Sequence, residues 1–209
     1  TREKGRETVA KALAERGLLG KAEEIEHNVS MSDRSKSPIE PLISEQWFVK
    51  MQPLAQPAMG AVKSGALRFK PERWTKVYLD WLTHVRDWCI SRQLWWGHRI
   101  PVWYDEDGVG IASREDLALG SPHPKTGKPL VRQDEDVLDT WASSWLWPFA
   151  TLGWPDDTPD LRRYYPTQFL STASEIIYLW VARMVIAGHA FLDQLPPERR
   201  TPFATCFIN

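Results

Sequence analysis

Thr167-Gln-Phe-Leu-Ser-Thr-Ala-Ser-Glu-Ile-Ile-Tyr-Leu-Trp-Val-Ala-Arg-Met184 is the stretch from which the fold class can be predicted. Residues 167–172 are typical of a strand, and residues from about 174 to 189 are apolar on nearly every side, as in a buried helix. The apolar run Phe203–Ile208 predicts a second strand. Strand, helix and strand in this order predict a right-handed crossover unit of a parallel sheet, so the fold class is α/β.

The junction between the first strand and the helix is the first candidate site. Thr172-Ala-Ser-Glu175 has the Thr-x-x-Glu spacing of a capping box, in which each side chain satisfies a backbone N–H of the first helical turn. Ligands of open parallel sheets bind at the carboxyl ends of the strands. We therefore expect a ligand near Thr172.

Periodicity and turn residues predict the elements of the remaining chain. Gly17 and Gly65 are expected to end two helices, and Pro71 suits the first turn of a third. The predicted elements are helices at residues 4–16, 52–64 and 71–86, irregular structure at 20–40, a short strand at 44–50, and a surface excursion with a small hairpin at 105–132.

Composition narrows the class of protein. The chain has 209 residues, 43% of them apolar, and a net charge of −1, which argues against a dominant basic surface for nucleic acid. Its two cysteines, Cys89 and Cys206, suit a reducing compartment, so we expect a cytoplasmic protein without membrane association. The start is charged, unlike a signal peptide, and lacks Met, so we expect the chain to begin inside a longer one.

Residue types alone indicate no catalytic centre. The sequence has neither a Gly-rich phosphate loop of common spacing nor a cysteine pair with metal-ligand spacing. Ser91 lacks an identifiable His–acid partner, and His98 is more simply a solvated or structural residue. One short acidic segment could bind Mg²⁺, but a solvated acidic turn is the simpler interpretation. Its acidic residues are Asp134, Glu135, Asp136 and Asp139.

Three segments together resemble the valyl-tRNA synthetases, a family of class I aminoacyl-tRNA synthetases. They are Ile90-Ser-Arg-Gln-Leu-Trp-Trp-Gly-His98 with its flanks, Asp134-Glu-Asp-Val-Leu-Asp-Thr-Trp-Ala-Ser-Ser-Trp145 with the residues to 155, and residues 165–184. Residues 39–50 add a weaker match. The resemblance covers nearly the whole chain, and the Leu-Trp-Trp-Gly-His form is like the valyl family in particular.

The resemblance implies a domain organisation. In that family a Rossmann-like catalytic domain is interrupted by an editing insertion. Residues 1–70 would then be the trailing edge of the insertion with a helical and irregular connective segment, and residues 71–209 part of the catalytic domain. The sequence contains neither the His-Ile-Gly-His-type nor the Lys-Met-Ser-Lys-Ser motif of the family, so we expect this chain alone to be inactive.

The resemblance also implies site residues. Trp141, Ile176 and Trp180 correspond by motif position to walls of the valine pocket, although plain core packing is an alternative for the two indoles. Thr172, Ala173 and Glu175 fall where related enzymes hold the ribose of the adenylate. There the family usually has Gly and then Asp, so Ala173 is bulkier and Glu175 reaches further. Glu175 could instead serve only as a capping residue.

The substrates implied by the resemblance are L-valine, ATP with Mg²⁺ and tRNA(Val), joined without a protein nucleophile. Ser32 and Ser35 stand where many relatives have cysteines, so we expect no structural zinc in this chain. Asn209 stands where several relatives have His. Two alternatives remain open: a degenerate relative that only binds RNA or protein, and a synthetase for isoleucine or leucine. The oligomeric state stays open as well.

Overall fold

The computed structural model describes residues 2–33 and 35–209, and the chain divides into two compact units, Thr1–Glu45 and Gln46–Asn209. In the first unit, helix α1 (Arg2–Glu15) is followed by Gly17, whose φ of 67° lies in the left-handed region that glycine adopts readily. The predicted helix at 4–16 is confirmed. The described part of residues 20–40 is irregular, as predicted, apart from an isolated bridge between Met31 and Pro38.

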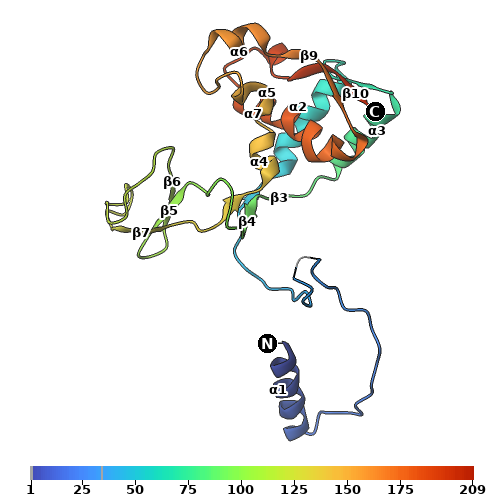
Figure 1. Ribbon diagram of the computed structural model, residues 1–209, viewed down its shortest axis with the longest axis vertical. Coiled ribbons are helices and arrows are strands. Elements are labelled where there is room, and N and C mark those ends of the chain that lie inside the picture. Colours follow the sequence, from blue (N-terminus) through green and yellow to red (C-terminus); the bar gives the residue numbers. More distant parts are fainter. Residues whose placement is uncertain (1, 34) are drawn as a thin grey trace. The chain divides into compact units, whose positions relative to one another are not determined.

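The centre of the second unit is a parallel sheet with strand order β2-β10-β9 (Figure 1). Its strands are β2 (Arg68–Lys70), β9 (Thr167–Thr172) and β10 (Phe203–Ile208). Phe203 lies opposite Thr167, and Ile208 lies opposite Thr172, so the two long strands end at the same edge. The predicted α/β class and both predicted strands are confirmed.

Three helices pack together beside this sheet. They are α2 (Met51–Lys63), α3 (Arg73–Thr83) and α7 (Ala182–Phe191), and α2 contacts both of the others. The core between helices and sheet includes Tyr78, Ile177 and Cys206, all fully buried. Burial of these side chains stabilises the unit by removing apolar surface from water. The helix predicted at 52–64 is confirmed, and Gly65 follows it with a φ of 81°.

Two predicted helices differ from the structure. The helix predicted at 71–86 is shorter, and Pro71 precedes it rather than lying in its first turn. The helix predicted at 174–189 consists of a 3-10 turn η1 (Ser174–Ile176), a π-helical turn η2 (Ile177–Val181) and α7. A π-turn widens the helix by one residue and occurs often at functional sites.

The predicted capping box is wrong. Ala173, not Thr172, occupies the N-cap position of η1, and no side chain caps the turn. Thr172 is buried as the last residue of β9, and its carbonyl accepts a hydrogen bond from Asn209 N at 3.1 Å. Sheet pairing therefore holds Thr172 where its side chain cannot reach the helical turn.

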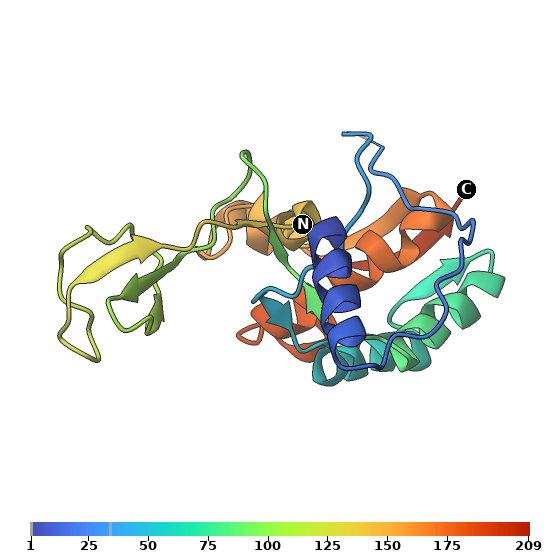
Figure 2. The same ribbon diagram turned by 90° about the horizontal axis from the view of Figure 1, so that it is seen from below.

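Antiparallel pairs complete the unit. The surface excursion predicted at 105–132 contains the hairpin of β5 (Val102–Asp105) and β6 (Gly110–Ala112), and β7 (Leu130–Gln133) pairs with the other side of β5. This sheet stands away from α2 and α7 in both views (Figure 1; Figure 2).

The strand predicted at 44–50 is reduced to two residues. Shorter pairs join β1 (Phe48–Val49) to β3 (Trp88–Cys89) and β4 (Ser91–Arg92) to β8 (Val137–Leu138).

Three short helices connect the antiparallel part to β9. They are α4 (Thr140–Ser144), α5 (Trp147–Ala150) and α6 (Pro159–Tyr164). The 3-10 turn η3 (Pro197–Arg199) lies between α7 and β10. None of the described helices has the length and apolarity that crossing a bilayer requires. The domain boundary predicted at residue 70 concerns the insertion of the family and stays a prediction.

Candidate substrate site at the end of the parallel sheet

The carboxyl end of the sheet is fixed by hydrogen bonds between its two long strands. The backbone bond from Asn209 to Thr172 is extended by the side chains of Ser171 and Asn209, whose Oγ and Oδ1 atoms lie 3.0 Å apart. Asn209 thus stabilises the last residue of β9. The strand end therefore presents the Thr172–Glu175 turn in a fixed position, as expected for a ligand site.

The turn after the strand exposes polar groups. Ala173 is half-buried in an extended conformation, and Ile176 N donates to its carbonyl at 3.4 Å, a long bond. Glu175 is exposed, and its Oε2 accepts a hydrogen bond from Ser174 Oγ at 3.4 Å. Because Glu175 caps nothing, its carboxylate can face a ligand.

The π-turn separates buried from half-buried side chains. Ile177 and Val181 are fully buried, whereas Ile176 and Trp180, each one residue earlier, are half-buried. The core therefore anchors the turn through one pair of residues and leaves the other pair at its margin. That arrangement suits a pocket wall, because the anchored residues hold the exposed ones in place.

Trp180 is tied to the helix that carries Trp141. The indole N–H of Trp180 donates to the carbonyl of Ser144 in α4 at 2.9 Å. Trp141 lies in the same short helix, half-buried and packed against the core, and α4 contacts the π-turn. The structure therefore brings the supporting elements of Trp141, Ile176 and Trp180 together.

A hollow of about 300 Å³ lies beside Trp180. Its lining includes Trp147, Phe169, Leu170 and Met184, so its walls are largely apolar. As far as the described residues go, Trp141 and Ile176 do not line it. Of the three predicted pocket residues, Trp180 alone reaches this hollow.

The acidic segment has internal partners. Asp139 precedes α4. Its carboxylate accepts a hydrogen bond from Trp88 Nε1 at 3.0 Å and forms an ion pair with Arg92 Nη2 at 3.1 Å. Asp134 accepts from Trp47 Nε1 at 2.8 Å and from the Tyr104 hydroxyl at 2.7 Å. The described residues contain no group of three or more His, Cys, Asp or Glu side chains placed to hold a metal ion. Both carboxylates thus hold strands and α4 together.

The Asp134–Tyr104 pair shows the electrostatic effect of this arrangement. Burial opposes the charge of Asp134, but the hydrogen bonds from Trp47 and Tyr104 outweigh it and hold the pKa of Asp134 below its usual range. Burial, together with the neighbouring Asp134 carboxylate, raises the pKa of Tyr104 to about 12. Tyr104 therefore remains a hydrogen-bond donor at neutral pH.

Comparison with known proteins decides the family. The sequence profile of the class I tRNA synthetases for isoleucine, leucine, methionine and valine (I, L, M and V) matches residues 4–209. The chain belongs to this family.

Relatives refine this membership. This synthetase chain is 54% identical over 196 residues to a valine–tRNA ligase of Thermotoga maritima and 52% identical over 204 residues to one of Dehalococcoides mccartyi. These alignments cover 93% and 98% of the chain, but it spans only 22% of the length of each relative. Apo methionyl-tRNA synthetase of Mycobacterium tuberculosis shares the fold, with a TM-score of 0.52 and 15% identity over 86% of this chain and 29% of that one.

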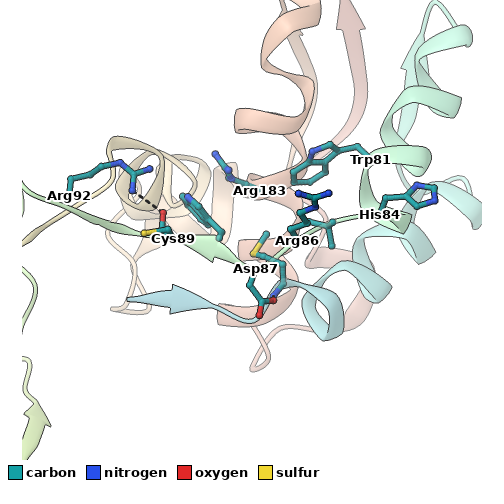
Figure 3. A pocket seen from close by; sticks show the side chains of 10 residues that line it. Trp81, His84, Arg86, Asp87, Cys89, Arg92 and Arg183 are labelled. Carbon is teal, nitrogen blue, oxygen red and sulfur yellow. Dashed lines mark hydrogen bonds between the residues drawn. The ribbon is translucent and has the colours of Figure 1, made fainter. Parts of the chain in front are cut away.

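One feature of the synthetase chain has no counterpart among the predicted site residues. Arg183 is only 8% exposed, and its guanidinium carbon lies 3.9 Å from the centroid of the Trp88 ring (Figure 3). Its Nη1 donates to the carbonyl of Leu179 at 3.0 Å. The signal in the sequence is a single cation within an otherwise apolar helix, which is rare for a buried residue.

Proposed function

We propose that the protein containing this chain joins L-valine to tRNA(Val) in an ATP-dependent reaction. The observation that carries the proposal is identity of 52–54% to several curated valine–tRNA ligases over nearly all of this chain. These relatives are valine enzymes rather than leucine or isoleucine enzymes. The Leu94-Trp-Trp-Gly97 segment, which resembles the valyl family, agrees with this choice.

The proposed amino-acid pocket consists of Trp141, Ile176 and Trp180. Two rigid indoles and a branched aliphatic side chain can surround an isopropyl group without offering it polar atoms. The hydrogen bond from Trp180 to Ser144 supports the proposal, because it consumes the indole N–H of Trp180 and leaves an apolar ring surface. Isoleucine adds a methylene, which a close-packed wall rejects sterically.

The proposed adenylate contacts come from Thr172, Ala173 and Glu175. The position of these residues at the carboxyl end of β9 supports their assignment. The exposed Glu175 carboxylate would accept hydrogen bonds from the ribose hydroxyls. Ala173 would lie against the ribose, and its methyl group leaves less space than glycine would.

The proposed chemistry needs positioning rather than a protein nucleophile. A carboxylate oxygen of valine attacks the α-phosphorus of ATP, the bond to the β-phosphate oxygen breaks, and pyrophosphate leaves. A hydroxyl of the 3′-terminal ribose of tRNA then attacks the acyl carbon and releases AMP. The proposed nucleotide substrate is ATP with Mg²⁺. Asp134 and Asp139 fit poorly as Mg²⁺ ligands, because indole, hydroxyl and guanidinium donors share one oxygen of each carboxylate, and Asp136 N donates to the other oxygen of Asp134.

Pyrophosphate exchange into ATP by the complete protein tests the proposal. Valine should support exchange, and isoleucine and leucine should support far less. A preference for isoleucine or leucine would overturn the pocket assignment. Exchange with none of the three would favour the degenerate relative that binds RNA or protein without activating an amino acid.

A further inference from the structure

A second cavity lies away from the residues of the proposed amino-acid pocket. It has a volume of about 480 Å³ and lies between the start of α2, the end of α3, β3 and the start of α7 (Figure 3). Arg86, Arg92 and Arg183 all line it, together with Trp81 and Trp88. We call it the arginine cavity. None of the six residues assigned to valine or the adenylate lines it.

Positive charge dominates the lining of the arginine cavity. The lining contains three guanidinium groups but a single carboxylate, that of Asp87. Asp87 is itself engaged, because its Oδ1 accepts a hydrogen bond from Met51 N at 3.1 Å. Asp139 lies close by and pairs with Arg92 at 3.1 Å, so it offsets one of the three cations. The lining therefore retains excess positive charge.

Arg183 supplies an unused donor within this lining. Its Nε atom is buried and has no hydrogen-bond partner in the described part of the chain, whereas Nη1 donates to Leu179. A buried donor without a partner costs free energy, and a buried cation costs more. The Trp88 ring beneath the guanidinium offsets part of that cost. An anion in the cavity would satisfy the remaining part.

Arg86 completes the lining from the rim. It is exposed, it follows the end of α3, and it makes no hydrogen bond or ion pair that involves the described residues. Its side chain can thus turn toward a ligand without breaking an existing contact. A rim cation and a buried cation on one cavity are the arrangement that phosphate-binding sites use, because guanidinium groups match the oxygens of a phosphate.

We propose that the arginine cavity binds a phosphate group. The site is separate from the proposed amino-acid pocket, so the inference does not depend on the proposed function. The same chemistry would accept a free phosphate compound or a phosphodiester of an RNA backbone. Inorganic phosphate is the smallest probe of this shared chemistry.

Calorimetric titration of the complete protein with inorganic phosphate, in the absence of valine and ATP, tests the site. We expect saturable binding that Arg86→Gln weakens about five-fold, the effect of losing a solvent-exposed ionic contact. Lys76→Gln is the matched control, because this substitution also removes one positive charge. Lys76 lies on α3 and lines a different hollow. It should leave phosphate affinity unchanged.

Two results would overturn the proposal: no saturable phosphate binding, or equal weakening by Arg86→Gln and Lys76→Gln. A second arm repeats the titration with transfer RNA bound. Loss of the Arg86-dependent phosphate signal would assign the cavity to an RNA phosphodiester, and an unchanged isotherm would assign it to a free phosphate compound. Either result of that arm supports a phosphate site. Failure of valine activation would not alter these titrations.

Discussion

The indole of Trp180 and the main-chain carbonyl of Ser144 form a hydrogen bond of 2.9 Å between the π-turn and α4. The two residues are 36 positions apart in the sequence. This bond ties the π-turn, which carries Trp180 and directly follows Ile176, to the helix that carries Trp141. It also removes the one polar group of Trp180 from the proposed pocket surface.

Trp180→Phe should test this bond. Phenylalanine keeps an apolar ring but donates no hydrogen bond, so the carbonyl of Ser144 loses its partner. We expect a loss of about 1 kcal/mol in the free energy of unfolding, measured with urea, and a higher KM for valine in exchange assays. Trp95→Phe is the control, because Trp95 is exposed and is not among the described residues that line the hollow beside Trp180. Equal effects of both substitutions on KM would remove Trp180 from the pocket.

Gly188→Ala should destabilise the protein strongly. A Cβ there would lie 2.3 Å from the carbonyl oxygen of Arg200 and 2.9 Å from the Tyr165 hydroxyl, so the backbone of α7 must shift. We expect a loss of about 2 kcal/mol or more by urea unfolding. Gly60→Ala in α2 meets no atom within 4 Å and should stabilise by about 0.5–1 kcal/mol. A neutral Gly188→Ala would contradict the close packing of α7.

Tyr104→Phe should change how stability depends on pH. The pKa of Asp134 is lower in the folded state, so its contribution is present above its unfolded pKa, about 3.9, and is lost as pH falls through the folded pKa. Removing the Tyr104 donor should cost about 1.5 kcal/mol at pH 7 and less at pH 3, where the carboxylate is increasingly protonated. Unfolding curves at both pH values measure the difference.

The control for Tyr104→Phe is Tyr164→Phe, because Tyr164 is exposed and is not among the described residues that act on Asp134. Its effect should be small and equal at both pH values. A loss from Tyr104→Phe that did not shrink between pH 7 and pH 3 would show that the hydrogen bond to Asp134 is not its cause.

Glu175→Gln should separate a ligand role from a structural one. The side chain is exposed and caps no helix, so the free energy of unfolding should change by less than about 0.5 kcal/mol. If Glu175 contacts the ribose, pyrophosphate exchange should fall about ten-fold, as for a charged hydrogen bond to substrate. Glu198→Gln, also exposed, should leave exchange intact. Equal exchange rates for both variants would refute the adenylate role.

The sequence by itself determined the local elements of this protein. Residues 203–208 form a strand because a largely apolar run with a β-branched end favours buried extended chain, and the helix that joins them to residues 167–172 makes the two strands pair in parallel. Gly17 and Gly65 end their helices because glycine adopts positive φ without strain. These outcomes depend on neighbours in the chain, so residue pattern suffices to predict them. The motifs likewise sufficed for the family.

Tertiary structure alone decided which distant groups meet. Thr172 pairs with β10 instead of capping a helix, Trp180 bonds to Ser144, and the guanidinium of Arg183 lies over the Trp88 ring in the lining of the arginine cavity. In each case several groups elsewhere in the chain could have been the partner of the residue. Only the packed core settles it, because a hydrogen bond or a buried charge is stable only where the surrounding side chains exclude water and fix the geometry.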